Sequence, residues 1–151
     1  MDIVKCMVKV NRARSTLRAL SATGRDISLK DGVVDTMPRG VGDHVNIVFF
    51  RPGPEFYEKG NLSCAALDAE YKRLGLRPDP QALIDYNAAN PTSADKQWNA
   101  CQWKREGGDF CYVAFDNWIG KRGATVARCS GDWSIGWVFA GVPEESLTSA
   151  T

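Results

Sequence analysis

The chain has 151 residues, of which 44% are hydrophobic and 25% charged, and its formal net charge is +1 at pH 7. This length suits one domain, and these proportions are ordinary for a soluble globular protein. No apolar run approaches the roughly 20 residues that a membrane-spanning helix needs, which excludes a helical membrane protein.

The sequence contains no internal repeat, low-complexity tract or linker, so we predict one domain over residues 1–151. The segment 1–6 lacks the charged start, long apolar run and small-residue cleavage site of a secretory signal. We therefore expect a cytosolic protein.

The cysteines indicate reduced thiols rather than a disulfide framework. Their number is odd and no two form a C-x-x-C pair; they are Cys6, Cys64, Cys101, Cys111 and Cys129. In the cytosol such cysteines are mostly reduced and buried. A zinc site needs closely spaced Cys or His ligands, and His44 is the only histidine. We expect no metal and no cofactor.

Positive charge is concentrated near the N-terminus. Residues 1–51 carry nine Lys or Arg and five Asp or Glu. The basic residues of the first 25 positions are Lys5, Lys9, Arg12, Arg14, Arg18 and Arg25. A basic face can attract nucleic acid or an acidic protein, and it can equally be a solvated surface. The near-neutral total argues against a non-specific DNA-binding protein.

The N-terminal part predicts two clear strands, at 2–10 and 44–50, where β-branched and apolar residues recur without a breaker. Pro52 and Pro54 stop the second strand, because proline cannot donate to a ladder. The segment 11–23 fits either a short helix capped by Ser15 or a strand or loop that continues to residues 27–29. The remaining features are a turn at 30–32, a short strand at Val33–Val34, and loops at 38–43 and 52–62.

Two helices are predicted in the middle of the chain. Ser63 caps the first, over 64–74, and Gly75 ends it. Asp79 caps the second, which begins at Pro80 and runs to about Asn90. The link between them is short, which predicts a helical hairpin.

From residue 97 onward the apolar pattern has a period of two, and all five tryptophans lie in this region. It predicts four strands, at 100–104, 110–118, 124–129 and 135–142, separated by glycine turns at 107–108, 120–123 and 131–132. We therefore expect an α+β fold. Its mainly antiparallel sheet, built from this four-stranded meander and the N-terminal strands, packs against the helical hairpin.

No catalytic constellation stands out. Cys111 with His44 is the only conceivable thiol and base pair, and a single histidine leaves few acid–base roles. Paired carboxylates are available in Asp109, Asp116 and Asp132, but aspartate beside a turn usually bonds to its own backbone. The sequence also lacks the glycine-rich phosphate-binding motifs. These observations predict a protein that is not an enzyme.

Aromatic and basic residues alternate in the C-terminal region. The candidate binding residues are Trp118, Lys121, Arg122, Arg128 and Trp133. Stacking aromatics beside cations can bind nucleotides or single-stranded nucleic acid. Tryptophan and arginine also dominate protein–protein hot spots. We expect most of the tryptophans to fill the core and at least one to be exposed.

The C-terminal 70 residues resemble small uncharacterised accessory proteins of tailed phages and prophages. The residues that carry the resemblance are W-K-x-x-x-G-x-F-C-Y-V-A-F-x-x-W-x-G-x-R from Trp103 and D-W-x-x-G-W-V-F-A-G-V from Asp132, preceded by the segment 76–95. The resemblance implies an accessory protein that acts in a bacterial cell, against a host process or a defence system such as CRISPR. The first function hypothesis is therefore binding and inhibition of a bacterial protein, and the alternative is a nucleotide or single-stranded nucleic-acid binding module.

Overall fold

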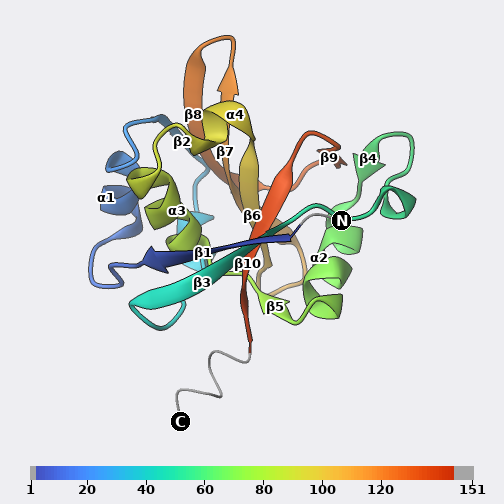
Figure 1. The fold of residues 1–151 in the computed structure, drawn as a ribbon, viewed down its shortest axis with the longest axis horizontal. Coiled ribbons are helices and arrows are strands. Elements are labelled where there is room, and N and C mark those ends of the chain that lie inside the picture. Colours follow the sequence, from blue (N-terminus) through green and yellow to red (C-terminus); the bar gives the residue numbers. More distant parts are fainter. Residues whose placement is uncertain (1–2, 145–151) are drawn as a thin grey trace.

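A computed structural model describes residues 3–144, and most of its strands form one mixed sheet (Figure 1). The strands of the main path lie in the order β1-β3-β10-β6-β7-β8-β2, and β5 pairs with β10 beside it. These strands are β1 (Ile3–Lys9), β2 (Asp26–Leu29), β3 (His44–Phe50), β5 (Leu76–Arg77), β6 (Asn99–Lys104), β7 (Phe110–Trp118), β8 (Lys121–Arg128) and β10 (Val138–Pro143). A separate pair is formed by β4 (Asn61–Leu62) and β9 (Trp133–Ser134).

The helices cover both faces of this sheet. They are α1 (Thr16–Ser21), α2 (Cys64–Arg73), α3 (Pro80–Ala89) and α4 (Ser93–Lys96), with short 3-10 turns at Val34–Thr36 and Pro54–Phe56. Residues of α1, α3 and α4 join one apolar cluster with Ile47 and Phe49 of β3. Residues of α2 join the other cluster with Val48 and Phe50. Since successive strand residues point to opposite faces, the two clusters lie on opposite sides of the sheet.

The α+β class and the mainly antiparallel sheet are confirmed, but the two central helices do not pack as a hairpin. The link between them forms β5, which pairs with β10 through Arg77 and Val142. The chain thereby passes from one face of the sheet to the other (Figure 1). The physical reason lies in α3, where Ala82, Leu83 and Ile84 are all fully buried. A helix buried on several sides needs cover from more than a hairpin partner, and α3 obtains it from the sheet and α1.

The expected four-stranded meander is also different. Strands β6, β7 and β8 follow one another antiparallel, but the last strand does not continue beside β8. Instead β10 lies between β3, which it meets antiparallel, and β6, which it meets parallel. Its residues Phe139, Ala140 and Val142 are buried towards alternate faces, as expected for a central strand. A continuous apolar run fits this interior position better than the edge of a meander.

The ambiguous N-terminal segment contains a helix. Ser15 caps α1 by accepting a hydrogen bond from the backbone N–H of Arg18. The pair Val33–Val34, expected as a strand, instead leads into the 3-10 turn Val34–Thr36. The expected loop 52–62 contains the second 3-10 turn and β4. Within residues 3–144 no helix is long and apolar enough to cross a membrane.

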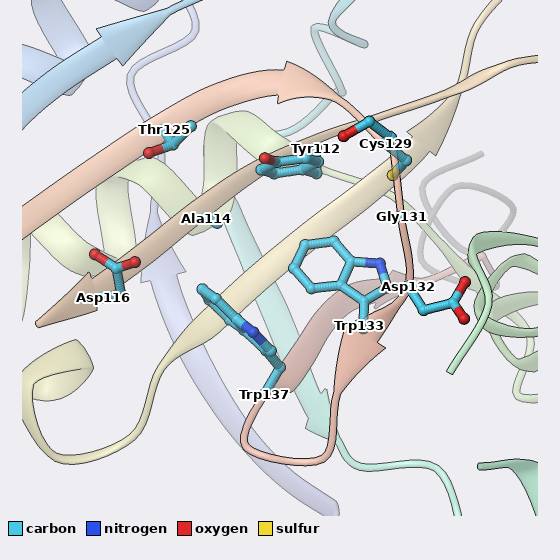
Figure 2. Close-up of a pocket in the computed structure, with 10 residues that line it drawn as sticks. Tyr112, Ala114, Asp116, Thr125, Cys129, Gly131, Asp132, Trp133 and Trp137 are labelled. Atoms are coloured by element: carbon cyan, nitrogen blue, oxygen red, sulfur yellow. The ribbon is translucent and has the colours of Figure 1, made fainter. Parts of the chain in front are cut away.

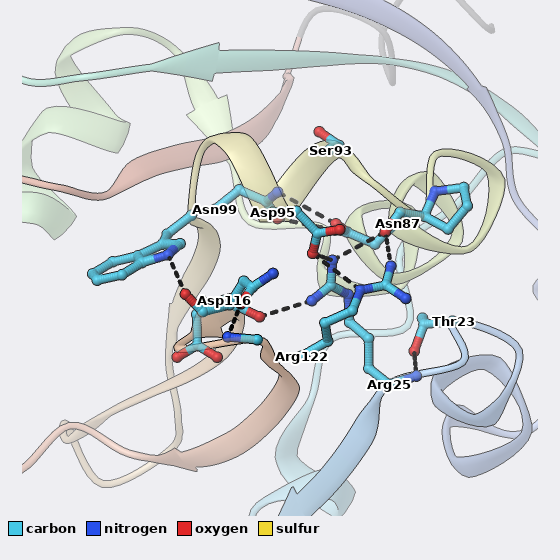
Figure 3. A network of polar contacts seen from close by, with 12 residues as sticks. Thr23, Arg25, Asn87, Ser93, Asp95, Asn99, Asp116 and Arg122 are labelled. Atoms are coloured by element: carbon cyan, nitrogen blue, oxygen red, sulfur yellow. Dashed lines mark hydrogen bonds and ion pairs between the residues drawn. The ribbon is translucent and has the colours of Figure 1, made fainter.

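A buried arginine joins the outer strands to α4 (Figure 3). The side chain of Arg25 is fully buried and donates to the backbone carbonyls of Asp116 and Pro91 and to the carboxylate of Asp95. Arg122 donates to the same carboxylate oxygen at 3.0 Å. Burial alone would raise the pKa of Asp95, but the hydrogen bonds from Arg122 and Arg25 outweigh it and lower that pKa.

We expect Asp95→Asn to lower the free energy of unfolding by about 3 kcal/mol, because it leaves the buried Arg25 charge without its counter-charge. Since the pKa of Asp95 is lowered in the fold, this contribution is present above its ordinary pKa and is lost as the pH falls through the folded value. Urea unfolding at neutral and acidic pH measures both effects. Asp68→Asn, which removes an exposed ion pair with Lys72, serves as the control and should cost less than about 0.5 kcal/mol.

Candidate functional site: the β7–β8 hairpin and its open face

The β7–β8 hairpin separates the residues that the sequence grouped as a binding site. In the register of the two strands, Trp118 pairs with Lys121, whereas Asn117 pairs with Arg122 and Cys111 with Arg128. Paired residues share a face, and successive residues alternate. Trp118 and Lys121 therefore point to one side of the sheet, and Arg122 and Arg128 point to the other.

Of the other three members, Arg128 is exposed on the opposite face, whereas Arg122 and Trp133 have structural roles. Arg122 bonds to Asp95 and to the carbonyl of Pro91. Trp133 is only 7% exposed, and its indole N–H donates to the side-chain oxygen of Gln102 at 2.9 Å. Of the five residues, only Trp118 and Lys121 lie together on accessible surface, so this arrangement lends no support to a nucleic-acid platform built from all five.

The basic N-terminal segment is largely tied into the fold. Arg12 makes a two-pronged ion pair with Asp79, both contacts being 2.8 Å. Arg14 contacts Asp85 at 2.6 Å, and Arg25 is buried against Asp95. These arginines hold the N-terminal segment to α3 and α4 and do not form a free cationic surface.

The conceivable catalytic pair is not assembled. His44 is exposed on β3 and contacts Asp43 at 3.2 Å. Cys111 is buried on β7, three strand positions across the sheet from β3, a lateral separation alone of roughly 14 Å. Burial also raises the pKa of the Cys111 thiol, so it is a poor nucleophile at neutral pH.

The three candidate carboxylates differ in their surroundings. Asp109 makes a two-pronged ion pair with Arg105 at 2.7 Å beside its turn, as expected for a structural aspartate. Asp116 and Asp132, in contrast, both line a hollow on the open face of β7 and β8.

The tip of the hairpin is made of exposed apolar residues. Trp118 is 64% exposed and Ile119 is 91% exposed. The loop has only two residues, Ile119 and Gly120, whose φ angles are 52° and 77°. Two positive φ values are typical of the tight hairpin turn that normally selects Asn-Gly. A β-branched residue in this conformation is strained, and Ile119 gains no burial in return.

The stem behind this tip is rigidly supported. The side-chain oxygen of Asn117 accepts a hydrogen bond from the backbone N–H of Gly120, with a nitrogen–oxygen distance of 3.0 Å. The ring of Trp98 lies 6.1 Å from that of Trp118, and its indole N–H donates to the carbonyl of Asn117. The tip therefore presents its two apolar side chains from a fixed base.

Aromatic contacts run from this tip into the core. Ring centroids are 5.4 Å apart between Trp98 and Trp137, 5.2 Å between Trp137 and Trp133, and 5.1 Å between Trp133 and Phe139. Trp103 is separate, because it belongs to the cluster on the opposite face. Trp103 and Trp133 are buried, Trp98 and Trp137 are half-buried and Trp118 is exposed. The expectation that at least one tryptophan is exposed is therefore confirmed, but fewer of them fill the core than expected.

A hollow of about 310 Å³ lies on the open face of β7 and β8 (Figure 2). Its floor contains small side chains, Ala114 of β7 and Thr125 of β8, which pair across the two strands. Tyr112, Trp133 and Trp137 form aromatic walls, with Asp116 towards one end and Asp132 towards the other (Figure 2). Small residues on the floor and large ones around it produce the depression.

A buried glutamine fixes one wall of the hollow. Gln102 of β6 is 2% exposed, accepts the Trp133 indole N–H and donates to the backbone carbonyl of Cys64 at 2.8 Å. The thiol of Cys129 also lies 3.5 Å from its side-chain oxygen. Gln102 thus joins β6, α2 and the segment after β8, and holds Trp133 in one orientation.

The carboxylate of Asp116 faces the hollow without a partner. Among residues 3–144, no side chain or backbone N–H donates to it, although its backbone carbonyl accepts from Arg25. Burial raises the pKa of Asp116, and the charge of Arg25 offsets this only in part. A partly buried carboxylate without a donor is costly to keep ionised, and such groups are often found at functional sites.

Two thiols lie beside the hollow, that of Cys64 at 3.4 Å from the carbonyl of Gly131 and that of Cys129 at 3.5 Å from Gln102. A hydrogen bond from Cys129 lowers the pKa of Cys64, against the opposing effects of burial and Asp132. The same contact raises the pKa of Cys129. Cys64 is also the first residue of α2, where the helix N-terminus favours a thiolate.

No protein-family model, curated protein or solved structure matches the chain. Within the part that the structure describes, no three His, Cys, Asp or Glu side chains are grouped so as to hold a metal ion. Nothing in the sequence pattern singles out Ile119, Gln102 or the Cys64 and Cys129 thiols as functional residues. The Ile-Gly pair between two strands is a turn signal, but the turn was expected at 120–123.

We expect Ile119→Asn to raise the free energy of unfolding by about 1 kcal/mol, because asparagine tolerates the left-handed conformation that strains isoleucine. Urea unfolding measures the change. The control is Ile135→Asn, since Ile135 is 53% exposed and its φ is not positive; it should change stability by less than about 0.5 kcal/mol. A loss of stability in Ile119→Asn would show that the Ile119 side chain supports the fold.

We expect iodoacetamide to alkylate Cys64 before the other cysteines, with a rate midpoint below the ordinary thiol pKa of about 8.5. Peptide mass mapping after short exposures between pH 6 and pH 9 measures the midpoint. Cys129→Ala, which removes the donated hydrogen bond, should raise it, and Cys129→Ser, which keeps a donor, should raise it less. An unchanged midpoint in Cys129→Ala would contradict this account of the pKa shift.

Proposed function

We propose that the chain is a non-enzymatic binding protein that inserts the tip of the β7–β8 hairpin into a protein partner. The observation that carries the proposal is Ile119, a strained β-branched residue that is 91% exposed. Backbone strain that is not offset by burial of the side chain is typical of functional positions. A hairpin tip that served only to reverse the chain would be served better by Asn-Gly.

The chemistry of the tip supports a protein partner. Binding energy at protein interfaces is concentrated in a few large side chains that enter pockets, and tryptophan is the most enriched among them. Trp118 and Ile119 together supply an aromatic and an aliphatic anchor. Because Trp98 and Asn117 hold the stem, little conformational entropy is lost when the tip is buried.

The setting of this interaction rests on the resemblance to phage accessory proteins. We propose that the partner is a bacterial host protein or a defence protein, such as a CRISPR component, in the cytosol of the infected cell. Binding would block that protein stoichiometrically, since the proposal assigns no catalytic group. The nucleotide or nucleic-acid alternative draws no support from the placement of Arg122 and Arg128, which point away from Trp118.

The test is capture from a bacterial lysate with the tagged chain and two variants. Ile119→Asn removes the more exposed of the two apolar side chains at the tip, and we expect it to stabilise the turn, so lost binding would not reflect unfolding. Leu17→Gln changes a 54% exposed apolar residue on α1 and serves as the matched control. We expect one protein to be captured in a fixed ratio by the parent chain and by Leu17→Gln, and at least about tenfold less by Ile119→Asn.

Two outcomes would overturn the proposal. One is that Ile119→Asn captures the same protein as well as the parent chain does, which would move the interface elsewhere. The other is that no protein is captured in a fixed ratio by any of the three chains. Quenching of tryptophan fluorescence by oligonucleotides at low salt would favour the nucleic-acid alternative, because phosphate contacts are strongest there.

A further inference from the structure

The hollow on the open face of β7 and β8 has the dimensions of a small ligand site. Its volume of about 310 Å³ is at the lower end of the range for ligand pockets, roughly 300–1,000 Å³. That space suits a group of about ten heavy atoms, because a water molecule takes up about 30 Å³ of liquid. One wall is held in place by Gln102, which accepts a hydrogen bond from the Trp133 indole.

The aromatic residues favour a cation. Tyr112 and Trp133 meet edge to face, with centroids 5.0 Å apart and planes at 72°. Trp133 and Trp137 do the same at 5.2 Å and 74°. The face of an aromatic ring is electronegative and attracts cations, and several rings around one space can together hold an alkylammonium group. Tyr112 and Trp137 are half-buried and therefore accessible from the hollow.

The charges around the hollow also favour a bound cation. Asp116 and Asp132 line it, and a neighbouring groove that shares Asp116 and Thr125 adds Asp26 and a single cation, Lys121. Within the described residues the Asp116 carboxylate accepts no hydrogen bond. Arg25, the other cation near it, is occupied by Asp95 and two backbone carbonyls. A bound cation would supply the partner that this carboxylate lacks.

We propose that this hollow binds an alkylammonium group, with Asp116 as the counter-charge and Tyr112, Trp133 and Trp137 as the aromatic walls. The group can belong to a free amine or to a lysine or methylated lysine side chain of a protein. The site does not depend on the proposed function, because none of the residues that line it belongs to the Ile119–Gly120 loop.

A glycine beside the carboxylate gives a specific way to disturb it. A Cβ at Gly123 would lie 2.9 Å from one carboxylate oxygen of Asp116. Gly123→Ala therefore displaces the carboxylate while keeping its charge. Asp116→Asn removes the charge while keeping the shape. Asp31→Asn, just before the 3-10 turn Val34–Thr36, removes the same charge from a residue that does not line the hollow.

The experiment is a titration of the full chain with choline, followed by the indole N–H signals in two-dimensional NMR. The uncharged isostere 3,3-dimethylbutan-1-ol is the ligand control. We expect saturable shifts of the Trp133 and Trp137 signals with choline and none that saturate with the alcohol. The dissociation constant should rise at least about tenfold in Asp116→Asn and several-fold in Gly123→Ala, and remain unchanged in Asp31→Asn.

Parallel titrations with N-acetyl-lysine methylamide and its trimethylated form distinguish the two sources of the cation. Tighter binding of either one than of choline assigns the hollow to a protein side chain, and tighter binding of choline assigns it to a free amine. Absence of saturable shifts with all three cations would overturn the proposal. Equal binding of choline and the alcohol, or equal affinity in Asp116→Asn and the parent chain, would overturn it as well.

The same titration on Ile119→Asn separates this site from the hairpin tip. We expect its affinity for choline to equal that of the parent chain. A loss of lysate capture together with unchanged choline binding would support both proposals. A loss of choline binding in Ile119→Asn would contradict the independence of the two sites.

Discussion

The structure depends on the insertion of β10 between β3 and β6. This strand joins the N-terminal pair β1 and β3 to the block formed by β6, β7, β8 and β2. It also contributes Phe139 to one core and Val142 to the other. At Gly141 a Cβ would lie 3.0 Å from both Leu76 and Tyr71, so the close packing of α2 and β5 on this strand requires glycine there. Because β10 follows all the other strands in the sequence, the sheet is completed by contacts that are distant along the chain, which is typical of slow-folding topologies.

Both candidate sites lie in the part of the sheet where helices no longer cover both faces. On one face, α1, α3 and α4 pack against the sheet and reach as far as β8 through Arg25, Asp95 and Arg122. On the other face, α2 covers only the central strands, and the β4–β9 pair stops at Trp133. The outer part of β7 and β8 on that face is left open. The hollow and the hairpin tip are thus accessible because the helices cover one face of the sheet more completely than the other.

Local signals in the sequence predicted the elements well. The caps Ser15, Ser63 and Asp79 each accept a backbone N–H in the structure, as their residue types suggest. The strands at residues 44–50 and 110–118 have the expected limits. The arrangement of these elements was not predictable in the same way. The apolar run 138–142 indicates a buried strand, but it does not indicate which strands lie on either side of it.

The sites were harder to predict for a related reason. Grouping Trp118 with Arg122 and Arg128 relied on closeness in sequence, but a strand sends neighbouring residues to opposite faces. The hollow needs Gln102 from β6 and Cys64 from α2 to orient Trp133 and Cys129. These residues are far apart in the sequence, and a lone glutamine in an apolar strand gives no sign of its partners. The sequence identifies Asp116 as a candidate carboxylate, but only the folded chain shows that no hydrogen-bond donor reaches it within the described residues.

The position of Trp118 and Ile119 within the sheet has a consequence for how the molecule avoids self-association. Pairing of β7 with β6 ends at Phe115 and pairing of β8 with β2 begins at Gly123, so the tip extends beyond its neighbouring strands. On β7, however, the backbone carbonyls of Asp116 and Asn117 already accept hydrogen bonds from Arg25 and the Trp98 indole. The open edges are β1 and the short β2, and Lys5 and Lys9 on β1 place charge along its edge. Another strand that paired with this part of β7 would have to displace the hydrogen bonds from Arg25 and Trp98. The exposed side chains of Trp118 and Ile119 therefore favour a partner whose shape fits the tip over one that extends the sheet.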